Sequence, residues 1–383
     1  MTMRLFRDTA VCRILPVRAL LLVVYLSILS ACALLTTVEP TPPPLQHSGS
    51  EIHVADVDVL AISPAMEEFL ERYILIYPNR HTRIHLLINA VSGMGPLGFD
   101  YDESLTLTAI ESFEARAGNC IGFANMMIAL ARRAGLNANY QEIIRRPEWA
   151  SHEDTVLLIK HINVVIENAD YSYVIDISGT KINPNMKRRI IKDNYAKALY
   201  LNNIGADALL DNDLPRAHAY LSKAVKTETR YTDSWVNLGV VFARNDQLDD
   251  AELALQRALE INRLESSAMN NLYEVYLAQE DLESAQTLQA KVNKYRNKNP
   301  YYLLKLSDAA LDEARYEDSI SLLKRAIRKS KYDHMLHFAL AKTQYLSGQT
   351  TVAEGSLVRA RELAPENMMV YYARPLDELV VEE

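Results

Sequence analysis

The residue in this sequence best placed for nucleophilic chemistry is Cys120. It follows Asn119, a good helix N-cap, and opens a run of helix formers that extends to Ala134, with Gly135 as the stop. Apolar residues in this run recur at three- and four-residue spacing, which predicts one face packed into a core. In the first helical turn, unpaired backbone amides and the positive end of the helix dipole favour a thiolate. We therefore predict a reactive Cys120 thiol with a pKa below the usual value of about 8.5.

Two residues downstream complete a catalytic set. Residues 155–167 read as a strand that contains His161, 168–170 as a turn, and 171–177 as a returning strand that contains Asp176. A tight hairpin brings His161 and Asp176 side by side on one face. A helix N-terminus packed against that hairpin then offers thiol, imidazole and carboxylate in series, as nucleophile, base and orienting group.

The elements needed to position these groups fall within residues 51–190, which we predict to be one domain. Cap and breaker residues divide its first half into helices over 64–77 and 79–91 and a third helix that is capped by Asp102 or Ser104 and ends at 114. A glycine-rich loop over 93–98 is predicted to form a rim of the site. The residues around Trp149 are predicted to form a loop between the cysteine helix and the histidine strand.

Three motifs around the candidate residues resemble the transglutaminase-like branch of the papain-like cysteine enzymes. They are Arg116-x-Gly118-x-Cys120-x-x-Phe123-Ala124, then His161-x-Asn163-Val164-Val165, then Ile175-Asp176. The resemblance covers residues 80 to 180 and implies an α+β papain/transglutaminase-like fold, a Cys120-His161-Asp176 triad, and no metal or other cofactor. Asn163 stands where many members of the family carry an aromatic residue, so the substrate class stays open.

The N-terminus has the pattern of a targeting segment. Four arginines precede a short apolar run over residues 19–29, and Leu29-Ser-Ala-Cys32 resembles the lipobox of bacterial lipoproteins. About 11 apolar residues are too few for a membrane-spanning helix, which is the alternative interpretation. We expect residues 1–31 to be a signal peptide and Cys32 to carry a lipid anchor. Ala33 then favours the outer membrane, with the protein facing the periplasm.

Residues 32–50 are rich in proline and are predicted to be a tether. Once residues 1–31 are removed and Cys32 is acylated, Cys120 is the one remaining thiol, which excludes an intramolecular disulfide. A lone thiol in an oxidising compartment is either buried and inert or used in chemistry. Its place at a helix start, with His161 and Asp176 downstream, favours use in chemistry.

From Tyr195 the sequence repeats with a period of 34 residues. Small residues recur in register, and Trp235-x-x-Leu238-Gly239-x-x-Phe242 resembles the tetratricopeptide consensus. Small side chains are needed where paired helices approach closely. We predict an all-α solenoid of five tetratricopeptide repeats over residues 195–365, with 366–383 as a C-terminal cap or tail.

A polar ladder runs through the first three repeats. Asn203, Asn237 and Asn271 are spaced at 34 residues, and by resemblance to other tetratricopeptide domains this position faces the inner groove. Side-chain amides there can hydrogen-bond an extended peptide backbone without reading its sequence. Alternatively, each asparagine satisfies a local backbone group. The ladder predicts a protein or peptide partner.

These features favour thiol-dependent acyl transfer on an amide, either hydrolysis of a peptide or isopeptide bond or transamidation. A net charge of −8 argues against nucleic acid as the main partner. The alternative is a non-catalytic scaffold, in which a degraded enzyme domain binds and the repeats assemble partners. The sequence does not separate hydrolysis from transamidation and does not identify the substrate.

Overall fold

The computed structural model describes residues 41–46, 52–152, 155–168, 172–177 and 187–381. The predicted signal peptide, the predicted lipidation site Cys32 and most of the predicted tether lie outside these residues. Among the residues that are described, no helix has both the length and the apolar character needed to cross a membrane. The described residues form an α+β region followed by an all-α array, which confirms the predicted fold class.

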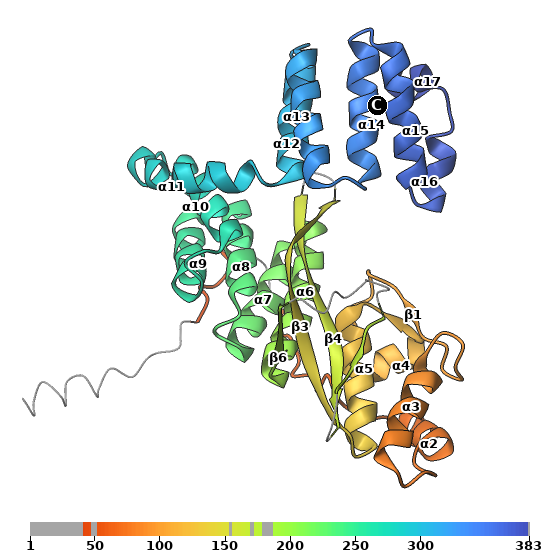
Figure 1. The fold of residues 1–383 in the computed structure, drawn as a ribbon. Coiled ribbons are helices and arrows are strands. Elements are labelled where there is room, and N and C mark those ends of the chain that lie inside the picture. The colour runs from red at the N-terminus through yellow and green to blue at the C-terminus, as the bar shows by residue number, and fades with distance from the viewer. Residues whose placement is uncertain (1–40, 47–51, 153–154, 169–171, 178–186, 382–383) are drawn as a thin grey trace, which may run out of the picture. The chain divides into compact units, whose positions relative to one another are not determined.

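The α+β region is built on a four-stranded antiparallel sheet with strand order β5-β4-β3-β6. Helix α5 packs against β3 and β4 (Figure 1). A second, two-stranded parallel sheet pairs β1 with β2. The elements in chain order are α2 (Pro64–Tyr73), α3 (Arg80–Val91), β1 (Asp100–Tyr101), α4 (Ala109–Ala115), β2 (Ala117–Gly118), α5 (Cys120–Arg133), β3 (Asn137–His152), β4 (Thr155–Glu167), β5 (Ser172–Ile175) and β6 (Lys187–Ile191).

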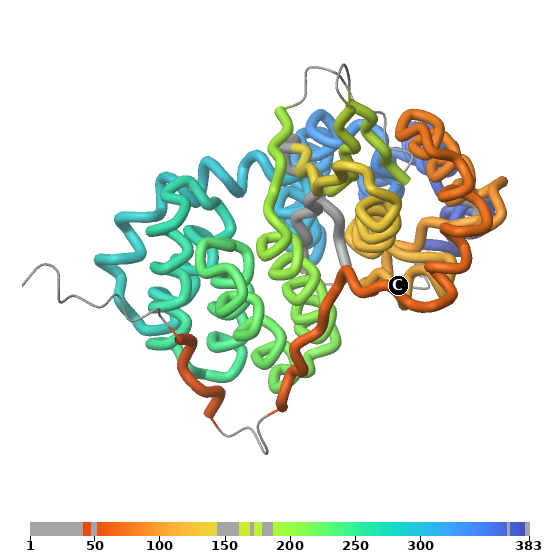
Figure 2. Tube along the Cα trace, turned by 90° about the horizontal axis from the view of Figure 1, so that it is seen from below, coloured from red at the N-terminus to blue at the C-terminus, as the bar shows by residue number. Residues whose placement is uncertain are grey.

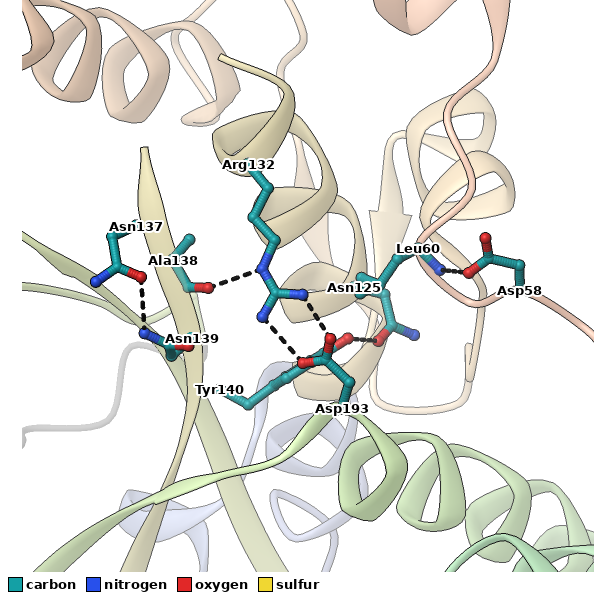
Figure 3. Close-up of polar contacts among 9 residues, drawn as sticks. All are labelled: Asp58, Leu60, Asn125, Arg132, Asn137, Ala138, Asn139, Tyr140 and Asp193. Carbon is teal, nitrogen blue, oxygen red and sulfur yellow. Dashed lines mark hydrogen bonds and ion pairs between the residues drawn. The ribbon is translucent and has the colours of Figure 1, made fainter. Parts of the chain in front are cut away.

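Polar contacts near the middle and the C-terminal end of α5 fix this helix to its surroundings (Figure 3). The Tyr140 hydroxyl on β3 donates a hydrogen bond of 2.7 Å to Asn125 Oδ1 within the core. Arg132 Nε donates to the Ala138 carbonyl at 2.9 Å, and its two terminal nitrogens hold both carboxylate oxygens of Asp193 at 2.6 and 2.9 Å. Since Asp193 is the first residue of α6, the same arginine ties the cysteine helix to the first helix of the array.

The apolar core of the α+β region continues into the first repeat. One cluster of buried side chains includes Met127 and Leu130 of α5, Tyr140 and Val164 of the sheet, and Leu199 of α6. Burial of this kind contributes about 25 cal/mol for each Å² of apolar surface removed from water. The core therefore does not stop at the predicted domain boundary near residue 190.

The array consists of five antiparallel helix pairs followed by two short helices. They are α6 (Asp193–Leu210) with α7 (Leu214–Thr227), α8 (Thr232–Arg244) with α9 (Leu248–Ile261), α10 (Ser266–Ala278) with α11 (Leu282–Arg296), α12 (Pro300–Asp312) with α13 (Tyr316–Lys329), α14 (His334–Leu346) with α15 (Thr350–Leu363), then α16 (Glu366–Tyr371) and α17 (Leu376–Val381). Gly239 shows why the repeats need small residues, because a Cβ there would lie 2.5 Å from Leu255 Cγ.

The buried core of the array is divided between α11 and α12. One cluster joins the helices from α6 to α11 and ends with Ala285 and the partly buried Leu288. Separate clusters begin at Leu303 and serve the later helices. Helix α11 buries only Ala285 and Val292 among its 15 residues, so little apolar surface crosses this point.

Candidate active site

Cys120 occupies the first position of α5, and Asn119 caps the helix as predicted. The Asn119 Oδ1 atom accepts from the backbone N–H groups of Ile121 at 3.2 Å and Gly122 at 3.1 Å. Its Nδ2 atom donates to Thr106 Oγ1 at 2.7 Å, which fixes the orientation of the amide. The cap therefore satisfies two backbone donors and leaves Cys120 at the positive end of the helix.

A close helix contact sets the position of that helix start. A Cβ on Gly122 would lie 2.9 Å from Ser112 Oγ of α4 and 3.4 Å from the backbone nitrogen of Leu107. Only glycine allows the two chain segments to approach this closely without displacement. This contact holds the first turn of α5, and with it Cys120, against the preceding helix.

His161 and Asp176 meet across neighbouring strands. In the β4–β5 pairing Val164 faces Ile175 and Ile166 faces Tyr173, so Asp176 follows directly after the last paired residue. His161 Nε2 contacts Asp176 Oδ2, and the two side chains are only 8% and 11% exposed. The hairpin thus brings together the two residues that the sequence analysis placed on one face.

The Cys120 sulfur lies beside the strand that carries His161. The backbone N–H of Ile162, the residue after His161, hydrogen-bonds the sulfur and lowers the pKa of Cys120, as do the N–H groups of the first helical turn. Desolvation by burial is the largest effect, however, and together with the Asp176 charge it raises the pKa of Cys120 above its ordinary value. The predicted lowering of this pKa is therefore wrong, because burial outweighs the backbone donors at the helix start.

Tyr101 lies near this group and is 43% exposed, and the sequence analysis missed it. Strand β1 pairs Tyr101 with Gly118, two residues before Cys120. Desolvation, followed by the charges of Cys120 and nearby carboxylates that include Asp176, raises the pKa of Tyr101 to about 12. A tyrosine hydroxyl is protonated near neutral pH with or without this shift and can donate a hydrogen bond. A two-residue parallel pairing has no periodic signal, so no local pattern could have identified Tyr101.

Asn163 contributes a buried amide on the same strand as His161. It is 1% exposed, and neither its Nδ2 nor its Oδ1 atom finds a hydrogen-bond partner among the described residues. Its cross-strand neighbour Gln141 has an Oε1 atom in the same condition. A buried polar group without a hydrogen-bond partner costs about 1 to 3 kcal/mol. Packing alone therefore does not account for the presence of Asn163 and Gln141 at these positions.

The three asparagines of the predicted ladder lie on α6, α8 and α10, and each is partly buried. Asn237 Nδ2 donates to Asn202 Oδ1 at 3.0 Å, and Asn271 Oδ1 accepts from Asn270 Nδ2 at 3.3 Å. Two of the three amides therefore have local side-chain partners. The role of Asn203, Asn237 and Asn271 in binding a partner stays a prediction.

Within the described residues, no group of three or more His, Cys, Asp or Glu side chains is arranged to hold a metal ion. His81 Nδ1 and His85 Nε2 instead share the Tyr173 hydroxyl, at 3.0 and 3.1 Å. Two surface cavities lie away from the candidate triad. Asn139, Ile191 and Asp193 are among the residues that line one, and Ile84, Leu136 and Glu167 are among those that line the other.

Comparisons with solved structures find several similar chains, each over less than half of this chain. YrrB, described as a TPR protein with an unusual peptide-binding site, is 15% identical over 46% of this chain and 91% of its own, with a TM-score of 0.26. MamA from Desulfovibrio magneticus RS-1 is 17% identical over 44% and 94%, with a TM-score of 0.28. Pseudomonas aeruginosa pilF is 15% identical over 46% and 81%, with a TM-score of 0.32.

Family profiles match both parts of the chain, whereas no curated protein matches it. Residues 88–174, which include Cys120 and His161, match the profile of the Transglutaminase-like superfamily. Residues 202–266 and 304–367 match the profile of the Tetratricopeptide repeat. The chain therefore contains a transglutaminase-like core domain followed by tetratricopeptide repeats.

Proposed function

We propose that this protein is a thiol enzyme that performs acyl transfer on amide bonds, with Cys120 as nucleophile, His161 as base and Asp176 as orienting group. The observation that carries the proposal is the convergence of three elements. The start of α5 presents the Cys120 sulfur to the backbone of Ile162, directly beside a buried His161–Asp176 pair. A match to the Transglutaminase-like superfamily over residues 88–174 supports this assignment.

In the proposed mechanism, His161 Nε2–H donates a hydrogen bond to Asp176, which fixes the tautomer, so Nδ1 is the nitrogen that takes up the thiol proton. The sulfur attacks the carbonyl carbon of the amide. His161 returns the proton to the leaving amine as the C–N bond breaks and a thioester forms. Water then gives hydrolysis, and an amine gives transamidation.

The developing oxyanion needs at least two donors. The backbone N–H of Cys120 is one, because the first amides of a helix have no partner within it. We assign the second donor to the Tyr101 hydroxyl, because Tyr101 pairs with Gly118, two residues before Cys120, and the Cys120 and Asp176 charges act on it. Removing one such donor typically lowers kcat by about 10²- to 10³-fold.

A raised Cys120 pKa has a consequence for the resting state. At neutral pH the sulfur is a thiol, so His161 must remove its proton during attack and does not act on a preformed thiolate. The alkylation rate of Cys120 by iodoacetamide should therefore keep rising with pH above the ordinary cysteine pKa of about 8.5. A rate that levels off well below that pH would contradict the raised pKa.

The direct test uses an activated peptide ester as a generic acyl donor. Wild-type protein should release a burst of alcohol and carry one acyl group on Cys120, detected by mass spectrometry of the tryptic peptide. Cys120→Ala should show neither, and Tyr101→Phe should slow acylation about 10²-fold or more. His161→Ala should lose the burst while Cys120 can still be alkylated. A wild-type thiol that reacts only after denaturation would rule out the enzyme.

The alternative function is a non-catalytic scaffold that uses the transglutaminase-like domain for binding. The observation that favours it is the desolvated, protonated Cys120 thiol, which is also what a buried structural cysteine would show. The acylation experiment separates the two functions. A folded wild-type protein with alkylatable Cys120 but no acyl transfer to ester or amide donors would support the scaffold.

Two further assignments complete the proposal. The repeats bind a protein or peptide partner through the ladder of Asn203, Asn237 and Asn271, and Cys32 anchors the chain to the outer membrane, facing the periplasm. A triple Asn→Ala variant should lose partner capture by about 1 kcal/mol for each lost bond. Cys32→Ser should release the protein from the detergent phase or leave an uncleaved precursor. Wild-type protein found wholly in the soluble fraction would exclude the anchor.

A further inference from the structure

A short proline-rich segment of the chain is seated on the array. Residues 42–46, Pro-Pro-Pro-Leu-Gln, which we call the strap, lie beside the first repeats (Figure 2, red). They belong to the stretch predicted to be a tether. Their partners are His218 on α7 and Asn245 and Gln247 in the turn between α8 and α9, which together we call the strap site.

Four hydrogen bonds join the strap to the strap site, and each of them involves the strap backbone. His218 Nε2 donates to the Pro43 carbonyl at 2.8 Å, and Asn245 Nδ2 donates to the Gln46 carbonyl at 2.9 Å. The Gln247 amide bonds twice. Its Nε2 donates to the Pro44 carbonyl at 3.2 Å, and its Oε1 accepts from the Gln46 N–H at 2.8 Å. The site therefore recognises an extended backbone, because it bonds one backbone N–H group and three backbone carbonyls of the strap.

One side chain of the strap is buried. Leu45 is 9% exposed and joins the apolar cluster of the first repeats, together with residues such as Leu221 and Phe242. Pro44 and Gln46 on either side of it are exposed. Leucine is thus the one position where the site selects a side chain, and about 1.5 to 3 kcal/mol is the usual gain for burying it.

The central residue of the strap site is held in place by the array itself. Gln247 is 7% exposed, and its amide also contacts Asn245 Nδ2 at 2.7 Å and Asp250 Oδ2 at 2.6 Å. These two neighbours orient the amide so that its remaining donor and acceptor face the strap. A buried amide arranged in this way loses little conformational freedom when a peptide binds. If no peptide occupies the strap site, the Gln247 amide lacks a hydrogen-bond partner on that side, which is unfavourable for a buried group.

The strap sequence matches that site. Proline fixes φ near −65°, so three consecutive prolines hold the segment extended before it binds and reduce the entropy lost on ordering. Proline also has no N–H to satisfy, while its carbonyl remains a good acceptor. Donors at His218 and Gln247 are therefore the groups that such a segment requires.

The 34-residue period shows that the strap site is a local specialisation. Residues one period on from His218, Asn245 and Gln247 are Glu252, Gln279 and Asp281, so carboxylates replace the donors of His218 and Gln247. Three periods on they are Ile320, Ser347 and Gln349, so the glutamine alone recurs. Gln349 Nε2 bonds Glu317 Oε1 at 3.1 Å, which provides a matched control within the same chain.

We propose that His218, Asn245 and Gln247 form an exchangeable binding site for an extended, proline-rich peptide with one leucine, and that the chain's own residues 42–46 occupy it in the free protein. A linked segment is present at an effective concentration in the millimolar range, so it excludes weaker peptides of the same class. A partner segment of this chemistry gains access by displacing the strap.

If Cys32 carries the proposed lipid anchor, occupancy of the strap site also sets how far the folded protein can extend from the membrane. With the strap seated, about 10 residues separate the anchor from the folded protein, which span at most about 35 Å at 3.3–3.6 Å for each residue. Release of the strap adds the residues up to about 52 and roughly doubles that span. The peptide site itself does not depend on the anchor or on Cys120.

The test uses the full chain and a fluorescent peptide with the sequence of residues 40–47. Leu45→Asp should eject the strap, so this variant should bind the probe at least tenfold more tightly than wild type does. Adding Asn245→Ala should weaken that binding about tenfold, whereas adding Gln349→Ala should leave it unchanged. Equal probe affinity of wild type and Leu45→Asp would overturn the proposal.

Amide hydrogen exchange gives a second readout that needs no probe. The Gln46 N–H, held by Gln247 Oε1, should be protected in wild type and exchange at the open-chain rate in Leu45→Asp. Thermal unfolding of each variant shows whether the fold is intact, and Asn245→Ala truncates a partly exposed side chain while the buried Gln247 side chain is kept. An unprotected Gln46 amide in wild type would show that the strap does not occupy the site.

Discussion

Helices α5 and α11 are nearly equal in length and differ in how the structure uses them. Eleven of the 14 residues of α5 are buried, and its polar side chains Asn125 and Arg132 bond β3 and α6. Helix α11 buries two of its 15 residues, and the apolar core of the array divides just after it. The two segments that match the tetratricopeptide profile, 202–266 and 304–367, do not include α11.

The contrast indicates which parts of the chain must be rigid. A residue with the role that we propose for Cys120 has to be held to a fraction of an ångström, and most residues of the helix that carries it are buried. A repeat only has to contact its neighbours. The repeat that contains α11 buries few side chains, so the repeats on its two sides are weakly coupled. We expect the region from α5 to α9 to behave as one tightly packed unit and the array beyond α11 to be less strongly coupled to it.

The largest predicted effect compares one substitution in the two helices. Leu130→Ala removes a fully buried side chain of α5 and should lower the free energy of unfolding by about 2 to 5 kcal/mol. Leu288→Ala in α11 affects a partly buried side chain and should cost about 1 kcal/mol or less. Chemical denaturation followed by circular dichroism measures both. Equal losses would remove the distinction between the helices.

The next effect comes from adding one methyl group at two helical glycines. At Gly239 a Cβ would meet Leu255 Cγ at 2.5 Å, so Gly239→Ala should destabilise the protein by about 1 to 3 kcal/mol. At Gly355 nothing lies within 4 Å, and Gly355→Ala should stabilise helix α15 by about 0.5 to 1 kcal/mol. Melting temperatures should therefore shift in opposite directions, and a shared direction would contradict the packing difference.

A smaller effect is expected from the removal of one hydroxyl. Tyr140→Phe deletes the donor to buried Asn125 Oδ1 and should cost about 1 kcal/mol or slightly more. The same change at Tyr295 on α11 affects a bond of 3.5 Å to Ser267 and should cost only a few tenths of a kcal/mol. Double-mutant cycles with Asn125→Ala and Ser267→Ala measure each coupling. A coupling larger at Ser267 than at Asn125 would reverse the ranking.

The smallest effect concerns pH at the edge of the packed unit. Lys197 and Lys223 hold exposed Asp56 at 2.9 and 3.4 Å and lower the pKa of its carboxyl below the ordinary value. Because the folded pKa is the lower one, the contact contributes stability above the unfolded pKa and loses it as pH falls through the folded pKa. Lys197→Met should raise the Asp56 pKa towards the ordinary value in an NMR titration. An unchanged pKa would show that the lysine does not hold the carboxylate.

Several features follow from residues that are close together in the sequence. Asn119 and Gly135 bracket the cysteine helix, which was predicted over 120–134 and is observed over Cys120–Arg133. The strand containing His161 has the predicted bounds, 155–167. The 34-residue period predicts the paired helices that follow. Caps, alternation and repeats act over a few residues or recur at a fixed spacing, so a single sequence displays them.

Other features depend on partners distant in the sequence. The residues around Trp149 were predicted to form a loop, but they belong to β3, which runs over Asn137–His152 because it pairs with β4 and β6. Arg145, Arg146 and Pro147 break the local strand pattern there, and the pairing with β4 shifts register across them. Cross-strand hydrogen bonds override a weak local preference of this kind.

The chemistry at Cys120 divides in the same way. The sequence determined that the sulfur stands at a helix start and that a histidine and an aspartate follow on a hairpin. Only the tertiary structure decided the sign of the Cys120 pKa shift, the approach of Tyr101, and the docking of residues 42–46 on α7 to α9. Desolvation and long-range hydrogen bonds depend on which segments pack around a group, and no local pattern records that.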